Sequence, residues 1–163
     1  MFDKEKLYFD IETAPNDLMP HSVFTFMDMV DKRAWDNSRF HFRSNHIAIT
    51  SDEYADGEPK NPEVLSKLLF PEYSDKFKHF ASTIGFAGRP GGPNFYINLT
   101  DNSRIHGPGG QKRYHLSEEA DSCFAKIVHG KDMVAKMNDK IQQGEKLDVV
   151  IETVRWIKQK KQS

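Results

Sequence analysis

Apolar and polar residues alternate along several short stretches of the chain, a pattern that predicts a protein built mainly from β-strands. The first of these stretches is Leu7–Glu12. Two more, Phe40–Arg43 and His46–Thr50, flank a predicted turn at Ser44-Asn45. The later stretches of the same kind are Asn94–Leu99, Ser122–Val128 and Leu147–Ile157.

Two other stretches space their apolar residues as helices do. His21–Val30 follows Pro20, a residue suited to the first turn of a helix. Its predicted buried face consists of Val23, Phe24, Met27 and Val30. The second helix is expected after a turn at Gly130, with its inward residues at Met133, Val134, Met137 and Ile141.

Long polar segments separate these elements. Ser51–Phe80 carries prolines and acidic residues and predicts an excursion from the sheet, with a short helix at Glu63–Phe70. Thr100–Asp121 predicts a second long loop. Because helices do not alternate with strands, a doubly wound sheet is not expected. The order of elements favours one domain over residues 1–163, an antiparallel barrel or sandwich with a helix at each end.

Composition and charge exclude several classes of protein. The chain has 163 residues, of which 37% are apolar and 29% charged, as in ordinary soluble domains. Its 23 basic and 24 acidic residues leave a net charge of −1, which argues against binding to nucleic acid or to a membrane surface. No apolar run is long enough to span a bilayer, and no signal peptide opens the chain. We therefore expect a cytoplasmic protein, or a domain trimmed from a longer one.

Few residues point to metal or covalent chemistry. Cys123 is the single cysteine, so no disulfide can form within the chain, and we expect a small buried apolar residue there. His41 and His46, with Asp52 or Glu53, match no compact zinc spacing. Neither a metal nor a cofactor is expected. Asn98-Leu99-Thr100 fits an N-glycosylation acceptor, although such triplets are common by chance.

The segment GFAGRPGGPNFYI, residues 85–97, joins a glycine- and proline-rich half to an aromatic strand. One interpretation is a stiff surface turn. The other is a loop that lies close to the backbone of a bound peptide, because glycine allows such an approach and proline removes the remaining freedom.

Four segments, taken in order, resemble the cyclophilin family of peptidyl-prolyl isomerases. PHSVFTFMDMV resembles the first helix of that family, and RFHF resembles its phenylalanine–histidine–arginine strand. GFAGRPGGPNFYI resembles the glycine-rich loop and the aromatic strand that follows it. CFAKIVHGKDMVAKM resembles the strand, glycine turn and second helix.

The resemblance implies a fold that is mainly β, a cyclophilin-like closed antiparallel barrel of about eight strands capped by two α-helices. YFDIETAPND matches the family's second strand, so the usual first strand has no counterpart here. Either one edge of the barrel is open, or residues before Leu7, another segment or another chain cover it.

The resemblance also implies a site for proline-containing peptides. The proline-pocket ring corresponds to Tyr96, the two glutamines to Thr50 and Asn94, and the neighbouring strand residue to Ile47. Ile105 or His106 stands near the family's tryptophan, and Asp121 stands at its histidine. The substrate-binding candidates are therefore Ile47, Thr50, Gly85, Phe86, Tyr96, Ile105 and His106, with Asn94 as a catalytic donor.

The charged catalytic donor is the position that departs most from the family pattern. Phe42 occupies the place of the family's arginine, and Arg43 follows one residue later. Because one residue reverses the face of a strand, Arg43 serves as the catalytic donor only if a bulge or a different register turns it inward. Otherwise it is an exposed charge. The sequence leaves two functions open, an isomerase-like protein that binds proline-containing segments with weak or lost catalysis, and a non-catalytic interaction module or assembly subunit on the same barrel.

Overall fold

The chain folds around one antiparallel sheet. The structure is a computed structural model that describes residues 6–43, 45–57, 67–111 and 119–157. The sheet has seven strands in the order β1-β6-β4-β5-β3-β2-β7. These strands are β1 Asp10–Thr13, β2 Ser38–Arg43, β3 Ile47–Tyr54, β4 Thr83–Gly88, β5 Gly91–Asn98, β6 Cys123–His129 and β7 Val149–Val150. The helices are α1 Pro20–Asp31, α2 Ser103–His106 and α3 Lys131–Gln142.

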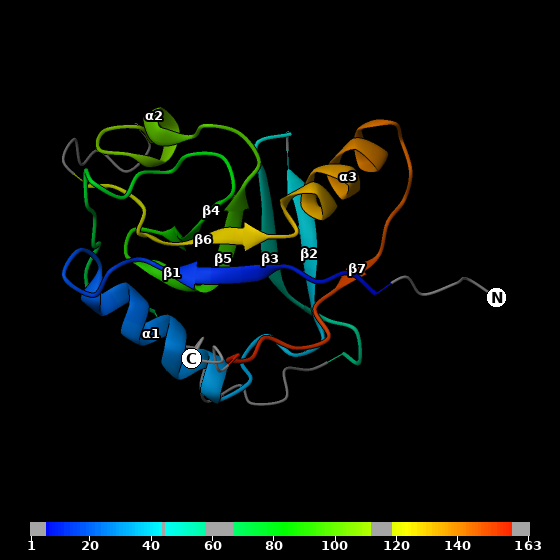
Figure 1. Cartoon of the computed structure of the whole chain (residues 1–163), viewed down its shortest axis with the longest axis horizontal. Helices are drawn as coiled ribbons and strands as arrows, with labels where there is room; N and C mark the ends of the chain where they lie inside the picture. Colours follow the sequence, from blue (N-terminus) through cyan, green and yellow to red (C-terminus); the bar gives the residue numbers. More distant parts are fainter. Residues whose placement is uncertain (1–5, 44, 58–66, 112–118, 158–163) are drawn as a thin grey trace, which may run out of the picture.

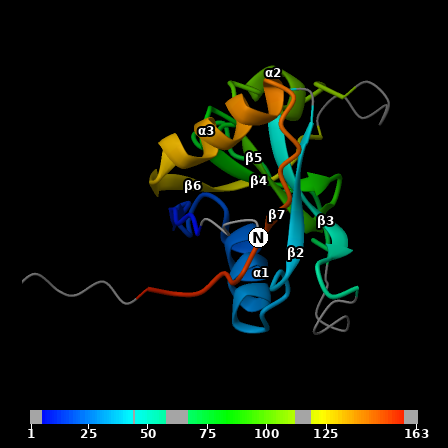
Figure 2. The same cartoon turned by 90° about the vertical axis from the view of Figure 1, so that its right-hand side faces the viewer.

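The sheet curls strongly into a half-barrel, with α1 and α3 at opposite ends of it (Figures 1 and 2). The expected mainly β, antiparallel architecture is confirmed. The expected closure is wrong, because β1 and β7 are the two ends of the strand order and do not pair with each other in the described residues. Leu147–Ile157 was expected to be one long strand, but only its residues 149–150 form a ladder.

The core lies on the inner face of the curl. Ala48, Ile97, Ile84 and Ala125 are register partners across four adjacent strands, and each is at most 2% exposed. Paired residues of an antiparallel sheet project to the same face, so this row is the inner wall. Aromatic rings fill the space between the sheet and α1, where Phe26 packs against Trp35 and Phe124.

Helix α1 begins at Pro20, as predicted, and two of the four residues of its predicted buried face, Val23 and Val30, are buried, whereas the other two are not. Phe24 is 71% exposed and Met27 is 40% exposed. The residues that pack against the sheet include Val23, Phe26 and Val30. Apolar side chains lie on two faces of this helix, so spacing alone did not decide which face is buried.

Helix α3 follows Gly130, whose φ of +80° is a conformation that favours glycine. A Cβ on Gly130 would also lie 2.9 Å from the Cα of Phe9. Of the predicted inward residues, Val134 is buried and Met137 packs at the margin of the core. The glycine thus allows the turn into α3 to pass close to the backbone of residues 8 and 9.

Two elements were not predicted, and one prediction is largely untested. Strand β4 was interpreted as part of a loop, and α2 was expected to be part of the second long loop. The predicted helix Glu63–Phe70 begins outside the described residues, and residues 67–70 are not helical. Strand β4 contains two glycines, which are depleted in strands, and this composition hid it.

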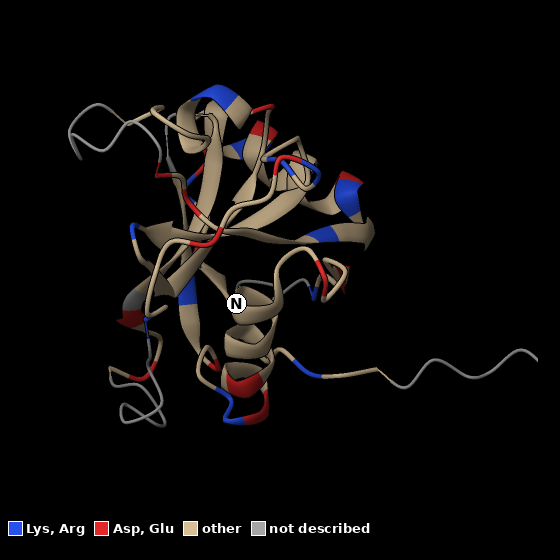
Figure 3. Cartoon of the chain, turned by 90° about the vertical axis from the view of Figure 1, so that its left-hand side faces the viewer, with Lys and Arg blue, Asp and Glu red and all other residues tan. Residues whose placement is uncertain are grey.

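The surface carries charges of both signs. Figure 3 shows lysine and arginine interspersed with aspartate and glutamate over the chain, and charges of both signs near the end of α1. Within the described part of the chain, none of the helices has the length and apolar character needed to cross a bilayer.

Candidate functional site

The candidate site lies on the outer face of the half-barrel. A row of register partners runs across five strands through His41, Ile49, Tyr96, Gly85 and Cys123. This row alternates with the inner row of the core, so its members project from the opposite face of the sheet. Tyr96 therefore lies on the outer wall, where the sequence predicted the ring of a peptide groove.

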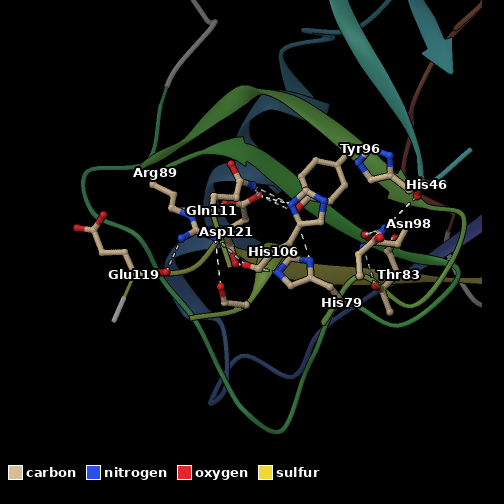
Figure 4. A network of polar contacts seen from close by, with 12 residues as sticks. His46, His79, Thr83, Arg89, Tyr96, Asn98, His106, Gln111, Glu119 and Asp121 are labelled. Atoms are coloured by element: carbon tan, nitrogen blue, oxygen red, sulfur yellow. Dashed lines mark hydrogen bonds and ion pairs between the residues drawn. The ribbon is translucent and has the colours of Figure 1, made fainter. Parts of the chain in front are cut away.

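The ring of Tyr96 is nevertheless 1% exposed. A second layer of polar residues covers it (Figure 4). The imidazole of His106 lies 4.7 Å from the Tyr96 ring between centroids, and that of His79 lies 6.0 Å away. The Tyr96 hydroxyl lies 3.3 Å from Nδ1 of His79 and 3.2 Å from Oδ2 of Asp121. The groove expected above Tyr96 is thus closed in this structure.

Arg89 and Asp121 form a buried ion pair beside this ring. Nε of Arg89 donates to Oδ1 of Asp121 at 2.7 Å, and their side chains are 0% and 3% exposed. The guanidinium also donates to the backbone carbonyls of Glu119, His106 and Gly107. Arg89 therefore holds together parts of the loop on both sides of residues 112–118.

The second carboxylate oxygen of Asp121, Oδ2, accepts further hydrogen bonds. Oδ2 accepts a hydrogen bond of 2.6 Å from Nδ1 of His106 and one of 3.2 Å from Nε2 of Gln111. Burial favours the neutral acid and by itself raises the pKa of Asp121, but the hydrogen bonds from His106 and Arg89 reverse this effect and hold the pKa below its usual range. The carboxylate is therefore charged and fully engaged.

Burial keeps the neighbouring titratable groups uncharged. It lowers the pKa of His79 to about 4 and raises the pKa of Tyr96 well above its ordinary value, the latter with help from the charge of Asp121. Cys123 is buried as predicted, and burial raises the pKa of its thiol to about 12. The site thus contains a neutral phenol, a neutral imidazole and one compensated ion pair.

The structure brings some of the predicted site residues together and separates others. Gly85 and His106 both lie against the side chain of Tyr96. Ile47 lies one row away, opposite Asn98, and is 8% exposed. Ile105 is 46% exposed on α2.

Two predicted groove residues belong to the interior instead. Phe86 is a register partner of Phe95, so it faces the core, where its ring stacks on Phe124 at 4.4 Å between centroids. Thr50 is 1% exposed, and its hydroxyl bonds to the backbone of Phe95 and to Asn94. Each differs from an outer-face position by one residue, which reverses the direction of the side chain.

The predicted catalytic donors have different surroundings. Asn94 is half-buried and adjoins the hydroxyl of Thr50. Arg43 ends β2 as the register partner of Ile47, and its side chain lies outside what the structure describes. Its predicted role stays a prediction.

Two minor sequence signals have plain outcomes. Asn98 is 1% exposed, and its amide donates to the backbone carbonyl and the hydroxyl of Thr83, so the folded chain offers no room for a glycan there. Across the described residues, no group of three or more histidine, cysteine, aspartate or glutamate side chains is arranged to bind a metal ion.

Position 85 on the outer face has no space for a side chain. A Cβ at this position would lie 2.8 Å from the Tyr96 hydroxyl oxygen and 2.9 Å from the carbonyl oxygen of Ser122. Gly85 therefore leaves space for the tyrosine of its own chain.

Substitution of Gly85 by alanine is expected to lower the free energy of unfolding by about 1–3 kcal/mol, because the extra methyl group overpacks this contact. Urea denaturation measures the change. In a Tyr96→Phe background the cost should be smaller, since the closest of the three atoms within 3.0 Å, the hydroxyl oxygen, is absent. An equal cost in both backgrounds would contradict the assignment of the contact to the Tyr96 hydroxyl.

Sequence reasoning missed Arg89, His79 and Gln111 as members of this network. Arg89 lies between Gly88 and Pro90, at the turn where Gly88 pairs with Gly91, and a charge in such a turn is ordinarily exposed. The stretch interpreted as either a turn or a groove loop is this hairpin turn. Nothing in the local sequence distinguishes a buried arginine there from an exposed one.

Comparisons with known proteins agree with this geometry. The model of the family described as cyclophilin type peptidyl-prolyl cis-trans isomerase/CLD matches residues 6–156. No curated protein matches the chain.

Similar solved structures include two cyclophilins. One is a cyclophilin type peptidyl-prolyl cis-trans isomerase of Cryptosporidium parvum, solved in the presence of the dipeptide Ala-Pro, with a TM-score of 0.61, 12% identity and 88% of each chain covered. The other is the Mimivirus cyclophilin, with a TM-score of 0.54, 17% identity, and 86% of this chain and 76% of that one covered. At such identities the likeness shows the fold alone. With the family match over nearly the whole sequence, the chain belongs to the cyclophilin-type peptidyl-prolyl cis-trans isomerase family.

Proposed function

We propose that this chain is a cyclophilin-type domain that binds proline-containing peptide segments and has weak or lost isomerase activity. The observation that carries the proposal is the place of Tyr96, the residue at the proline-pocket position, in the outer-face row of the sheet beside Gly85. Its 1% exposure is the reason to expect weak or lost catalysis. Gly85 lies directly against the Tyr96 ring, and Ile47 lies on the same face of the sheet. The structure of the Cryptosporidium parvum relative with Ala-Pro supports proline peptides as the ligand class.

Catalysis of prolyl isomerisation needs more than a pocket. The amide must twist through a barrier of about 18–20 kcal/mol, and an enzyme lowers it by binding the twisted state more tightly than the planar one. A charged donor near the proline nitrogen contributes to that preference. Arg89 directs its donors at Asp121 and at three backbone carbonyls, so it is not placed for this role. Arg43 is the remaining candidate on the predicted strand.

An Ala-Pro-containing test peptide, followed by NMR exchange spectroscopy at high protein concentration, tests this function. Peptide resonances are expected to shift on binding, while isomerisation stays near the uncatalysed time of about tens to hundreds of seconds. Large acceleration by the wild-type chain, abolished by Arg43→Ala, would contradict lost catalysis and would make Arg43 the charged donor. Asp148→Asn, an exposed substitution, is the control.

The closed groove also favours a second function, a non-catalytic interaction module or assembly subunit. Such a role needs no opening above Tyr96. Failure of the test peptide to shift any resonance, in a chain that is folded, would favour this function over peptide binding.

A further inference from the structure

We propose that residues Ser103–Gln111 act as a plug that the chain places in its own peptide groove, so that a peptide binds only after the plug has left. This inference rests on the proposed function. It concerns how access to the site is controlled, which the family assignment does not address. The plug comprises α2 and the turn that follows it.

The plug covers the groove with His106. The imidazole lies 4.7 Å from the ring of Tyr96 between centroids, with an angle of 30° between the planes. His106 is itself only 5% exposed. A proline ring that approached Tyr96 from outside would meet this imidazole first, so His106 occupies the space that a ligand ring needs.

A latch of hydrogen bonds holds the plug in place. Arg89 donates to the carbonyl oxygens of His106 and Gly107, and the backbone N–H of Asp121 donates to the same His106 carbonyl. The carboxylate of Asp121 accepts a hydrogen bond from Nδ1 of His106. All of these contacts come from residues 89 and 121, at the edge of the groove. The latch is therefore local, and its release does not require the core to open.

The plug contains a buried polar atom without a hydrogen-bond partner. Nε2 of His106 is buried and has no hydrogen-bond partner among the described residues. Burial of a polar atom without a partner costs free energy, which the plug recovers when water reaches that nitrogen. The plug also contains little regular structure, because α2 has four residues and Ile105 is 46% exposed. A segment with few buried apolar contacts is among the first parts of a protein to open.

Removal of the imidazole tests the plug directly. His106→Ala keeps the Arg89–Asp121 pair and removes the nearer of the two imidazoles that cover Tyr96. Because a site that is mostly closed reduces the apparent affinity by the fraction that is open, an Ala-Pro-containing peptide is expected to bind His106→Ala about fivefold more tightly or better. Titration calorimetry measures the affinity. Nitration of tyrosines by tetranitromethane, mapped by mass spectrometry, is expected to reach Tyr96 in the variant and not in the wild-type chain.

The matched control is Arg104→Ala. Arg104 is an exposed residue of the same short helix, so its removal should leave both the affinity and the protection of Tyr96 unchanged. If His106→Ala proves unfolded by circular dichroism, Gln111→Ala replaces it. Gln111 lies 3.2 Å from both Nδ1 of His106 and Oδ2 of Asp121, so its loss is expected to loosen the latch in the same direction but less.

The outcomes separate the plug from the function on which it rests. Equal or weaker peptide affinity in a variant whose Tyr96 is nitrated overturns the plug and leaves peptide binding intact. Absence of binding by both chains, with Tyr96 nitrated in the variant, overturns the proposed function and the plug with it. Protection of Tyr96 in a folded His106→Ala variant overturns the assignment of His106 as the residue that closes the groove.

Discussion

Replacement of Asp121 by asparagine is expected to lower the free energy of unfolding by about 3–5 kcal/mol. The substitution keeps the shape of the side chain but removes its charge, and it leaves the guanidinium of Arg89 with an exposure of 0% and no anion at 2.7 Å. A buried charge without its counter-ion carries the full penalty of desolvation. Chemical denaturation at neutral pH measures the loss.

The control for Asp121→Asn is Glu12→Gln. Glu12 pairs with Lys126 at the same 2.7 Å, but the two side chains are 57% and 49% exposed. Pairs of this kind contribute at most about 1 kcal/mol, since water already solvates both charges. The double variant Arg89→Met/Asp121→Leu should recover part of the stability lost by Asp121→Asn, because it removes both charges together. Equal losses for Asp121→Asn and Glu12→Gln would contradict the burial of the Arg89–Asp121 pair.

Stability is also expected to fall steeply as the pH falls from about 6.5 to 4, through the titration of His79. The folded chain holds His79 neutral down to a pKa of about 4, whereas the imidazole of the unfolded chain has its ordinary pKa of 6.5. Between these values the unfolded chain binds the extra proton, so protonation favours unfolding. The expected loss between pH 7 and pH 4 is on the order of 3 kcal/mol. The lowered pKa of Asp121 adds a loss of the same sign at still lower pH.

Denaturation midpoints measured across this range, for the wild-type chain and for His79→Gln, test the assignment. The variant lacks the titrating imidazole, so its free energy of unfolding should depend less on pH between 6.5 and 4. His129→Gln is the control, because that side chain is 79% exposed. An identical pH dependence for wild type and His79→Gln would show that the buried imidazole does not cause the loss of stability between pH 6.5 and 4.

The elements that the sequence predicted best are those whose pattern is local. Helix α1 begins at Pro20, and α3 follows Gly130, because each signal lies within one turn of the feature that it marks. Strand β4 escaped prediction since Gly85 is required by a contact with Tyr96, eleven residues later, and the glycine makes the segment look like a loop. Phe24 and Met27 were wrongly assigned to the buried face of α1 for a similar reason, because the position of the sheet decides which side of the helix is covered.

In the candidate site, too, the features with a local sequence signal were predicted and those that depend on distant contacts were not. The sequence places Tyr96 on a strand, and the resemblance assigns it to a peptide groove, but neither indicates what covers the ring. The residues that cover the ring are His79, which precedes β5 in the sequence, and His106, which follows it. The ion pair of Arg89 with Asp121 lies beside them. Contacts between residues so far apart in sequence leave no periodic signal, so only the folded chain identifies them.

The unclosed sheet has a consequence for behaviour at high concentration. Terminal strands with unpaired backbone groups can recruit strands from other molecules and seed fibrils. The two edge strands are poor templates for strand addition. Strand β7 has two residues, and β1 has four, of which Asp10 and Glu12 carry carboxylates. The short length of β7 and the two carboxylates of β1 are features that disfavour strand addition from other molecules, so we expect the open edges to contribute little to aggregation.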